Sequence, residues 1–196
     1  MALNNDSVLT AAKGYIFTAP VGTAPPSPAE VDAFTDGSAL ADWENLGHTA
    51  RDELPEFGFD GGDTETRGTW QAESLREVTT EAAVDYVTFN AHQFDPDVLE
   101  LYYGTENTST DPNVFGVRSL NSRSQERALL IVIIDGDHKV AFYAPRVSIR
   151  REEAITLAVD EFAVLPLRAT FLTPTSGDLF QWITGAPEAA PEALAA

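Results

Sequence analysis

The alternation of apolar and polar residues predicts a chain built mainly from β-strands. A period of two is clear at 84–90, where Val84, Tyr86, Thr88 and Asn90 would share one face of a sheet and Val87 and Phe89 the other. Residues 126–152 predict a β-hairpin with DGD at 135–137 as its turn. Further strands are expected at 14–21, 44–50, 56–60 and 113–120, with two in all within 64–91 and one or two within 155–173.

The segment DPDVLELYYG, residues 95–104, breaks this period and predicts a helix. Asp95 can cap it, Pro96 suits its first position, and Gly104 can end it. An apolar stripe at helical spacing would pack on the sheet: Val98, Leu99, Tyr102 and Tyr103. SGDLFQWITG, residues 176–185, could form a short terminal helix.

The predicted domain organisation is one domain over 13–185, with an N-terminal arm at 1–12 and a flexible C-terminal tail at 186–196. Residues 22–43 are rich in proline and turn residues and predict a loop. Strands do not alternate with helices, which argues against a parallel doubly wound sheet. The fold class is therefore mainly β: a sandwich or open barrel with one flanking helix and long extended loops or arms.

Charge and composition narrow the function. The chain of 196 residues has a net charge of -19, and residues 1–98 hold 18 acids against 4 bases. Such a field repels phosphates, so gripping of nucleic acid is not expected. The absence of Cys excludes disulfides, thiolate zinc sites and thiol nucleophiles. No apolar run could span a bilayer, and the N-terminus lacks the pattern of an export signal.

The segment FGFDGGDTETRGTW, residues 57–70, concentrates glycines, acids and aromatic residues. Asp60, Asp63 and Glu65 suggest calcium, but the spacing of a calcium loop is absent, and no Lys follows the glycines as a phosphate loop requires. A tight connection between strands, with Gly61 and Gly62 at positive φ, is the simpler interpretation. The three histidines are isolated in sequence. We find no catalytic, metal or cofactor site.

Arginines cluster at a second place. Arg146, Ser148 and Arg150 would lie on one face of a strand, with Arg151 just beyond. They form either a solvated strand face or a basic patch that meets the acidic half of a neighbouring copy.

Three segments together carry a resemblance to a known family: residues 43–89, the helix segment 95–104, and DEFAVLPLRATFL at 160–172. They resemble the major tail tube proteins of long-tailed, non-contractile bacteriophages, especially those infecting actinobacteria. The likeness covers roughly residues 10–175, and 43–104 is its most specific part.

The resemblance implies a structural virion protein of the phage tail, assembled in the host cytoplasm, and not an enzyme. It implies hexameric rings stacked into a hollow tube whose acidic lumen lets DNA pass without specific binding. Tape-measure, tail terminator and baseplate proteins would be its partners, with no cofactor and no membrane.

Within that family a long loop or hairpin reaches an adjacent subunit or ring, and the resemblance places residues 57–70 there. Phe57, Phe59 and Trp70 are then candidate apolar anchors and Arg67 a candidate ion-pair donor, although the aromatics could equally fill the core of their own monomer. Two alternatives remain open from the residues alone. One is a monomeric β-sandwich module that binds carbohydrate or calcium, and the other is an acidic hydrolase.

Overall fold

Two long antiparallel strands form the centre of the fold. The computed structural model describes residues 3, 8–111, 113–117 and 124–185. In it β7 (Gln125–Asp135) and β8 (His138–Arg151) pair along most of their length, joined by a turn in which Gly136 has a φ of 61°. The predicted hairpin and its turn are therefore present at the expected residues.

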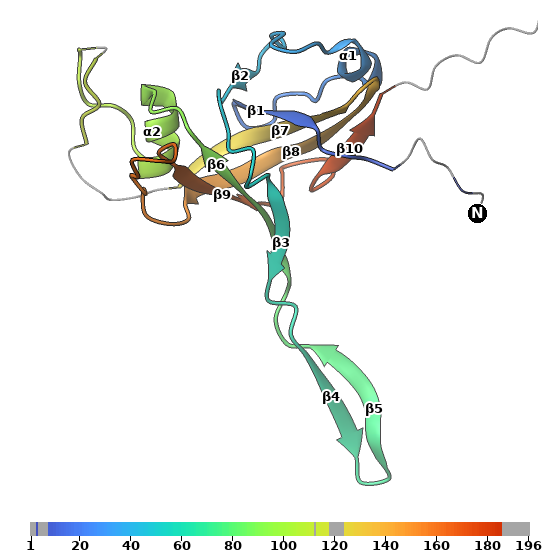
Figure 1. The fold of residues 1–196 in the computed structure, drawn as a ribbon. Helices are drawn as coiled ribbons and strands as arrows, with labels where there is room; N and C mark the ends of the chain where they lie inside the picture. The colour runs from blue at the N-terminus through green and yellow to red at the C-terminus, as the bar shows by residue number, and fades with distance from the viewer. Residues whose placement is uncertain (1–2, 4–7, 112, 118–123, 186–196) are drawn as a thin grey trace, which may run out of the picture.

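The other strands extend this pair into one strongly curved sheet (Figure 1). Its strand order is β2-β1-β7-β8-β9-β6-β3, and β10 pairs with the first half of β8, which β9 leaves free. The bounds are β1 (Lys13–Ala19), β2 (Glu44–Asn45), β3 (Glu56–Asp60), β6 (Val84–Ala91), β9 (Leu165–Phe171) and β10 (Gln181–Thr184).

The two sides of this sheet come close to closing into a barrel. Residues 44–50 pair with β1 through β2 and then with β6, where Thr49 bridges to Ala91. The predicted strand over 44–50 is thus reduced to two residues and one bridge, because Gly47, with a φ of 88°, interrupts it. The fold class, a mainly β sandwich or open barrel, is confirmed.

The β7–β8 pair is buried on both faces, which explains its uninterrupted apolar run. Leu129 and Ile131 point into a core that β6, β9 and α2 (Pro96–Tyr103) complete. Leu130 and Val132 point the other way, into a second core under α1 (Pro28–Ala33) and Trp43.

The predicted helix at 95–104 is confirmed, with one difference at its start. Gly104 ends α2 in the left-handed conformation with a φ of 65°. Asp95 occupies the N-cap position, but its side chain makes no capping hydrogen bond and instead accepts one from the Gln93 amide at 2.7 Å.

Helix α1 was not predicted, since residues 22–43 were expected to be a loop. Ser27 and Glu30 form a capping box: the Ser27 hydroxyl accepts from the Glu30 backbone N–H, and the Glu30 carboxylate accepts from the Ser27 backbone N–H. Pro28 follows the cap directly. The spacing S-x-x-E beside a proline was the signal that the loop interpretation passed over.

Three other predictions were wrong. The terminal helix expected at 176–185 is absent, and residues 181–184 form the strand β10 instead, because Trp182 packs on Phe142 while the next residue, Ile183, packs on the second core. Residues 113–117 form no strand, and the rest of that expected strand lies outside the described residues. Residues 64–91 hold three strands and not two: β4 (Thr64–Thr69), β5 (Ala72–Thr79) and β6. Half of the expected arm at 1–12, and all of the expected tail at 186–196, lie outside the described residues.

Candidate assembly surface

The most unusual feature of the molecule is a hairpin that stands away from its body. Strands β4 and β5 pair with each other in a separate two-stranded sheet, and Figure 1 shows them at the end of a long extension of β3 and β6. Nearly every residue of the hairpin is exposed, and Trp70 at its tip is 99% exposed. An isolated two-stranded hairpin is marginally stable at best. Its order is therefore expected to depend on contacts beyond this monomer.

The β4–β5 hairpin and the ends of β3 and β6 that carry it form a projecting arm. Its base, at β3 and β6, is held to the body by aromatic packing on one face. The Phe57 ring lies 4.7 Å from that of Phe142 and 5.3 Å from that of Trp182. Phe57 is 39% exposed, whereas Phe59, two residues further out, is 66% exposed. Phe57 thus anchors the arm to its own body, and the aromatic residues become progressively more exposed toward the tip.

The opposite face of the arm base holds a stacked polar arrangement. The Arg168 guanidinium lies 3.5 Å from the centre of the Tyr86 ring, and that ring covers Gly58 on the neighbouring strand. Arg168 also donates to the carboxylates of Asp60 and Glu152, the latter at 3.1 Å. Burial lowers the pKa of Arg168, but these two carboxylates outweigh it and hold the pKa above its ordinary value.

Two glycines set the direction of the hairpin. Gly61 and Gly62 connect β3 to β4 with φ angles of 74° and 82°, a conformation that other residues rarely adopt. A Cβ on Gly61 would lie 2.7 Å from the carbonyl oxygen of Ala82, in the connection between β5 and β6. The expected tight connection is therefore present, and it joins the arm base to the hairpin.

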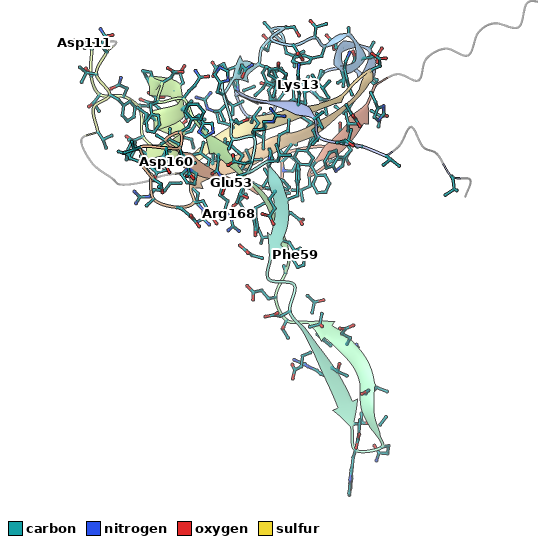
Figure 2. All side chains as sticks on the ribbon, in the orientation of Figure 1. Lys13, Glu53, Phe59, Asp111, Asp160 and Arg168 are labelled. Carbon is teal, nitrogen blue, oxygen red and sulfur yellow. The ribbon has the colours of Figure 1, made fainter. Side chains whose placement is uncertain are left out.

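A deep groove runs beside the arm base. It has a volume of about 1150 Å³ and lies between residues 50–56, the segment 152–167 and strand β6. Figure 2 places Glu53 and Asp160 on the body near Arg168, while the hairpin extends away from them. We call it the acidic groove, because it is lined by seven carboxylates and by no Lys or Arg: Asp52, Glu53, Glu56, Glu152, Glu153, Asp160 and Glu161.

Comparison with known proteins gives this architecture a context. The model of the phage tail tube protein family matches residues 1–195. The chain belongs to the phage tail tube protein family. It is 46% identical over 188 residues to the major tail protein Gp23 of Mycobacterium phage D29 and 45% identical over 188 residues to that of Mycobacterium phage L5, covering 93% of both chains in each case. The resemblance seen in the sequence is confirmed.

This tail tube protein is a structural component of a phage virion and not an enzyme. Proteins of this kind form a tube with copies of themselves and with other tail proteins, so its functional surfaces are those that meet neighbours. Neither helix in the described part of the chain is long and apolar enough to cross a membrane.

The arginines expected to form a basic patch have different surroundings. Arg146 donates two hydrogen bonds to the Glu126 carboxylate, at 2.9 Å and 3.1 Å, and one to the Thr173 carbonyl. Arg150 and Arg151 are exposed and line a hollow of about 520 Å³ beside α2. The predicted patch is therefore divided: Arg146 is used within the monomer, and Arg150 and Arg151 remain candidates for contact with a neighbour.

Two of the three residues considered for calcium pair with arginines. Asp60 is bound to Arg168, and the Glu65 carboxylate lies 3.4 Å from the Arg67 guanidinium. Within the described residues no group of three His, Asp or Glu side chains is arranged to hold a metal ion.

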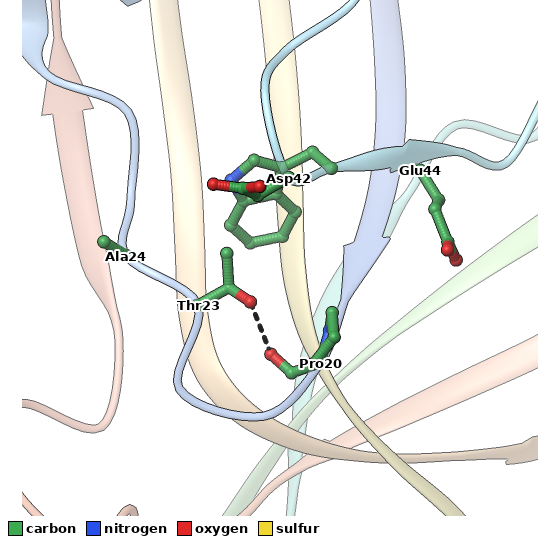
Figure 3. Close-up of a pocket in the computed structure, with 6 residues that line it drawn as sticks. Pro20, Thr23, Ala24, Asp42 and Glu44 are labelled. Carbon is green, nitrogen blue, oxygen red and sulfur yellow. Dashed lines mark hydrogen bonds between the residues drawn. The ribbon is translucent and has the colours of Figure 1, made fainter.

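A further hollow of about 570 Å³ lies where β1 ends (Figure 3). Trp43 and Asp42 line it, and at its edge the Thr23 hydroxyl donates a hydrogen bond to the Pro20 carbonyl.

Sequence reasoning missed two parts of this surface. It treated residues 57–70 as the contact loop, whereas the hairpin continues through β5 and adds Leu75 and Arg76 to the exposed surface. The acidic groove could not be read from the sequence, because residues 52–56 and 152–161 are brought together only by the pairing of β9 with β6.

Proposed function

We propose that copies of this chain form hexameric rings that stack into the hollow tail tube, through which DNA leaves the phage particle. The observation that carries this proposal is the β4–β5 hairpin, which projects from the body with a fully exposed tryptophan at its tip. A large exposed apolar side chain on a poorly supported element is typical of a protein–protein contact. An exposed, projecting hairpin with an apolar tip is therefore suited to bind a neighbouring copy.

Free sheet edges support association of the same kind. β3 forms one end of the sheet, and β10 pairs with β8 on one side only. Unpaired edges invite pairing with another chain, and a closed ring of subunits would remove them from solvent. Phe59 and Trp182, both well exposed, lie on these two edge strands and are candidate contacts alongside Trp70 and Arg67.

The charge of the chain suits a conduit for DNA. A surface with a net charge of -19 per copy repels phosphates, and it offers few cations that could displace the counterions of DNA. DNA would therefore pass through the lumen without specific binding. Tape-measure, tail terminator and baseplate proteins would set the length of such a tube and close its ends.

Electron microscopy of the concentrated, purified chain tests this proposal. Assembly is best attempted at moderate salt, because screening weakens the repulsion between copies that are all strongly acidic. Six-fold rings or hollow tubes of uniform diameter are the expected result. Particles that remain monomeric at every salt and protein concentration, in the presence of tail partners as well as alone, would contradict it.

A further inference from the structure

We propose that the acidic groove receives the arginine-bearing face of the β4–β5 hairpin from a second copy of the chain. This inference rests on the proposed function, since it names the surface that the hairpin would bind in the tube. Three observations support it: unpaired charge in the groove, an unfavourable arrangement of arginines on the hairpin, and the direction in which the hairpin points.

The groove carries more negative charge than its surroundings neutralise. Glu152 is bound to Arg168, and Glu53 accepts a hydrogen bond from the Asn90 amide. The side chains of the other five carboxylates in its lining have no ion pair or hydrogen bond with another described residue. A concave surface of a single sign of charge concentrates the electric field and favours an occupant of the opposite sign.

The hairpin offers that opposite sign in an arrangement that is unfavourable on its own. Arg67 and Arg76 lie directly opposite each other on β4 and β5, so both side chains stand on one face. Like charges in this position destabilise a strand pair. Glu65 approaches Arg67 only to 3.4 Å and both are well exposed, so this contact offsets little of the repulsion. Carboxylates placed against both arginines would turn a destabilising pair into a binding surface.

Among the described residues, the hairpin is the segment that combines exposed arginines with reach. Arg51, Arg150 and Arg151 are also exposed and have no carboxylate partner among those residues, but all three lie on the body. The hairpin projects from the body and can therefore enter a groove on another molecule (Figure 2). It extends away from the groove of its own copy, so the occupant that we propose comes from another copy.

The rim of the groove suits the apolar tip of the hairpin. Leu54 and Phe162 line the groove and remain exposed, Phe162 at 82%. They could cover part of Trp70 once the arginines are in place. Hairpin and groove are different surfaces of one molecule, so the contact is head-to-tail and propagates from copy to copy, closing into a ring where the rotation allows it.

Charge reversal tests the pairing in the full chain. R67E/R76E should raise the protein concentration needed for tube formation on the order of tenfold or more. Adding D160K/E161K, which reverses two exposed groove acids, should restore assembly by returning opposite charges to the contact. The matched control combines R67E/R76E with E106K/D137K, which has the same net charge but alters exposed acids away from the groove, and it should not restore assembly. Equal rescue by both sets, or normal assembly of R67E/R76E, would overturn the proposal.

Cross-linking separates this inference from the proposed function. The chain has no Cys, so introduced thiols react without background. A T69C chain mixed with an A158C chain should form a disulfide-linked dimer, because Thr69 lies near the hairpin tip and Ala158 lines the groove. T69C mixed with D137C is the control and should form far less. Dimers without any tubes would support the pairing and count against the tube. Tubes of T69C and A158C chains without this cross-link would overturn the pairing and leave the tube standing.

Discussion

The β7–β8 and β4–β5 hairpins are both antiparallel, yet only the first is supported by its own monomer. Every residue from Ala128 to Val132 is buried, with one face of the strand in each of the two cores. In β4 no residue is buried, and the hairpin has no core on either face. The comparison shows two sources of order in one chain. The body is stabilised by its own apolar residues, whereas the hairpin has no such support within the monomer and, under the proposed function, would gain it from neighbouring copies.

The strongest test of this difference is truncation of one large apolar side chain in each region. Phe142 is fully buried at the centre of an aromatic cluster with Phe57, Phe171 and Trp182. Phe142→Ala should lower the free energy of unfolding of the unassembled protein by about 3–5 kcal/mol. Leu75→Ala on the hairpin should change it by less than about 0.5 kcal/mol. Denaturant titration measures both, and similar losses would show that the monomer does support its hairpin.

The body was more predictable from sequence than the hairpin for the same physical reason. Burial imposes a pattern, so alternation located β1, β3, β6 and the β7–β8 pair, and the caps located α2. Exposed strands such as β4 and β5 are under no such constraint and merged with β6 in the prediction. The sequence showed where the aromatic residues are but not what they contact. Phe57 packs on the body of its own monomer, whereas Trp70 is almost fully exposed. That distinction required the three-dimensional structure.

The connection between the two regions gives the next largest effect. Gly61→Ala would place a side chain at positive φ and against the Ala82 carbonyl, and should destabilise the chain by about 1–2 kcal/mol or more. Gly136→Ala is the matched control, because Gly136 also has positive φ but its Cβ would meet nothing within 4 Å. We therefore expect the larger loss of both stability and tube formation for Gly61→Ala. Equal losses would mean that the close contact at the arm base is unimportant.

Replacing one tryptophan at a time by alanine compares the tip of the arm with its base. Trp70→Ala should leave the stability of the monomer within about 0.5 kcal/mol of the original while impairing tube formation. Trp182→Ala should lower monomer stability by more than about 1 kcal/mol, because its ring packs on Phe57 and Phe142. Light scattering and thermal unfolding report the two properties separately. A Trp70→Ala chain that unfolds outright would place Trp70 in a core that the structure does not contain.

The smallest expected effect concerns an ion pair at the end of the β7–β8 hairpin. Hydrogen bonds from Arg146 hold the pKa of Glu126 below its ordinary value of 4.5. A carboxylate with a lowered pKa in the folded state stabilises the fold at pH values above its ordinary pKa, and this contribution is lost as the pH falls through the folded value. Both side chains are partly exposed, so solvent screening keeps the contribution small.

Unfolding of the unassembled chain between about pH 5 and about pH 3 measures this contribution. Glu126→Gln should lose less stability over that interval than the original chain, because it has no carboxylate left to protonate at this position. Glu73→Gln provides the control: Glu73 lies on the hairpin, and its side chain has no hydrogen bond or ion pair with the described residues. Its stability curve should therefore run parallel to that of the original. If both variants behaved alike, the body would gain no more from its paired carboxylate than the hairpin does from a solvated one, and the contrast between the two regions would lie in apolar packing alone.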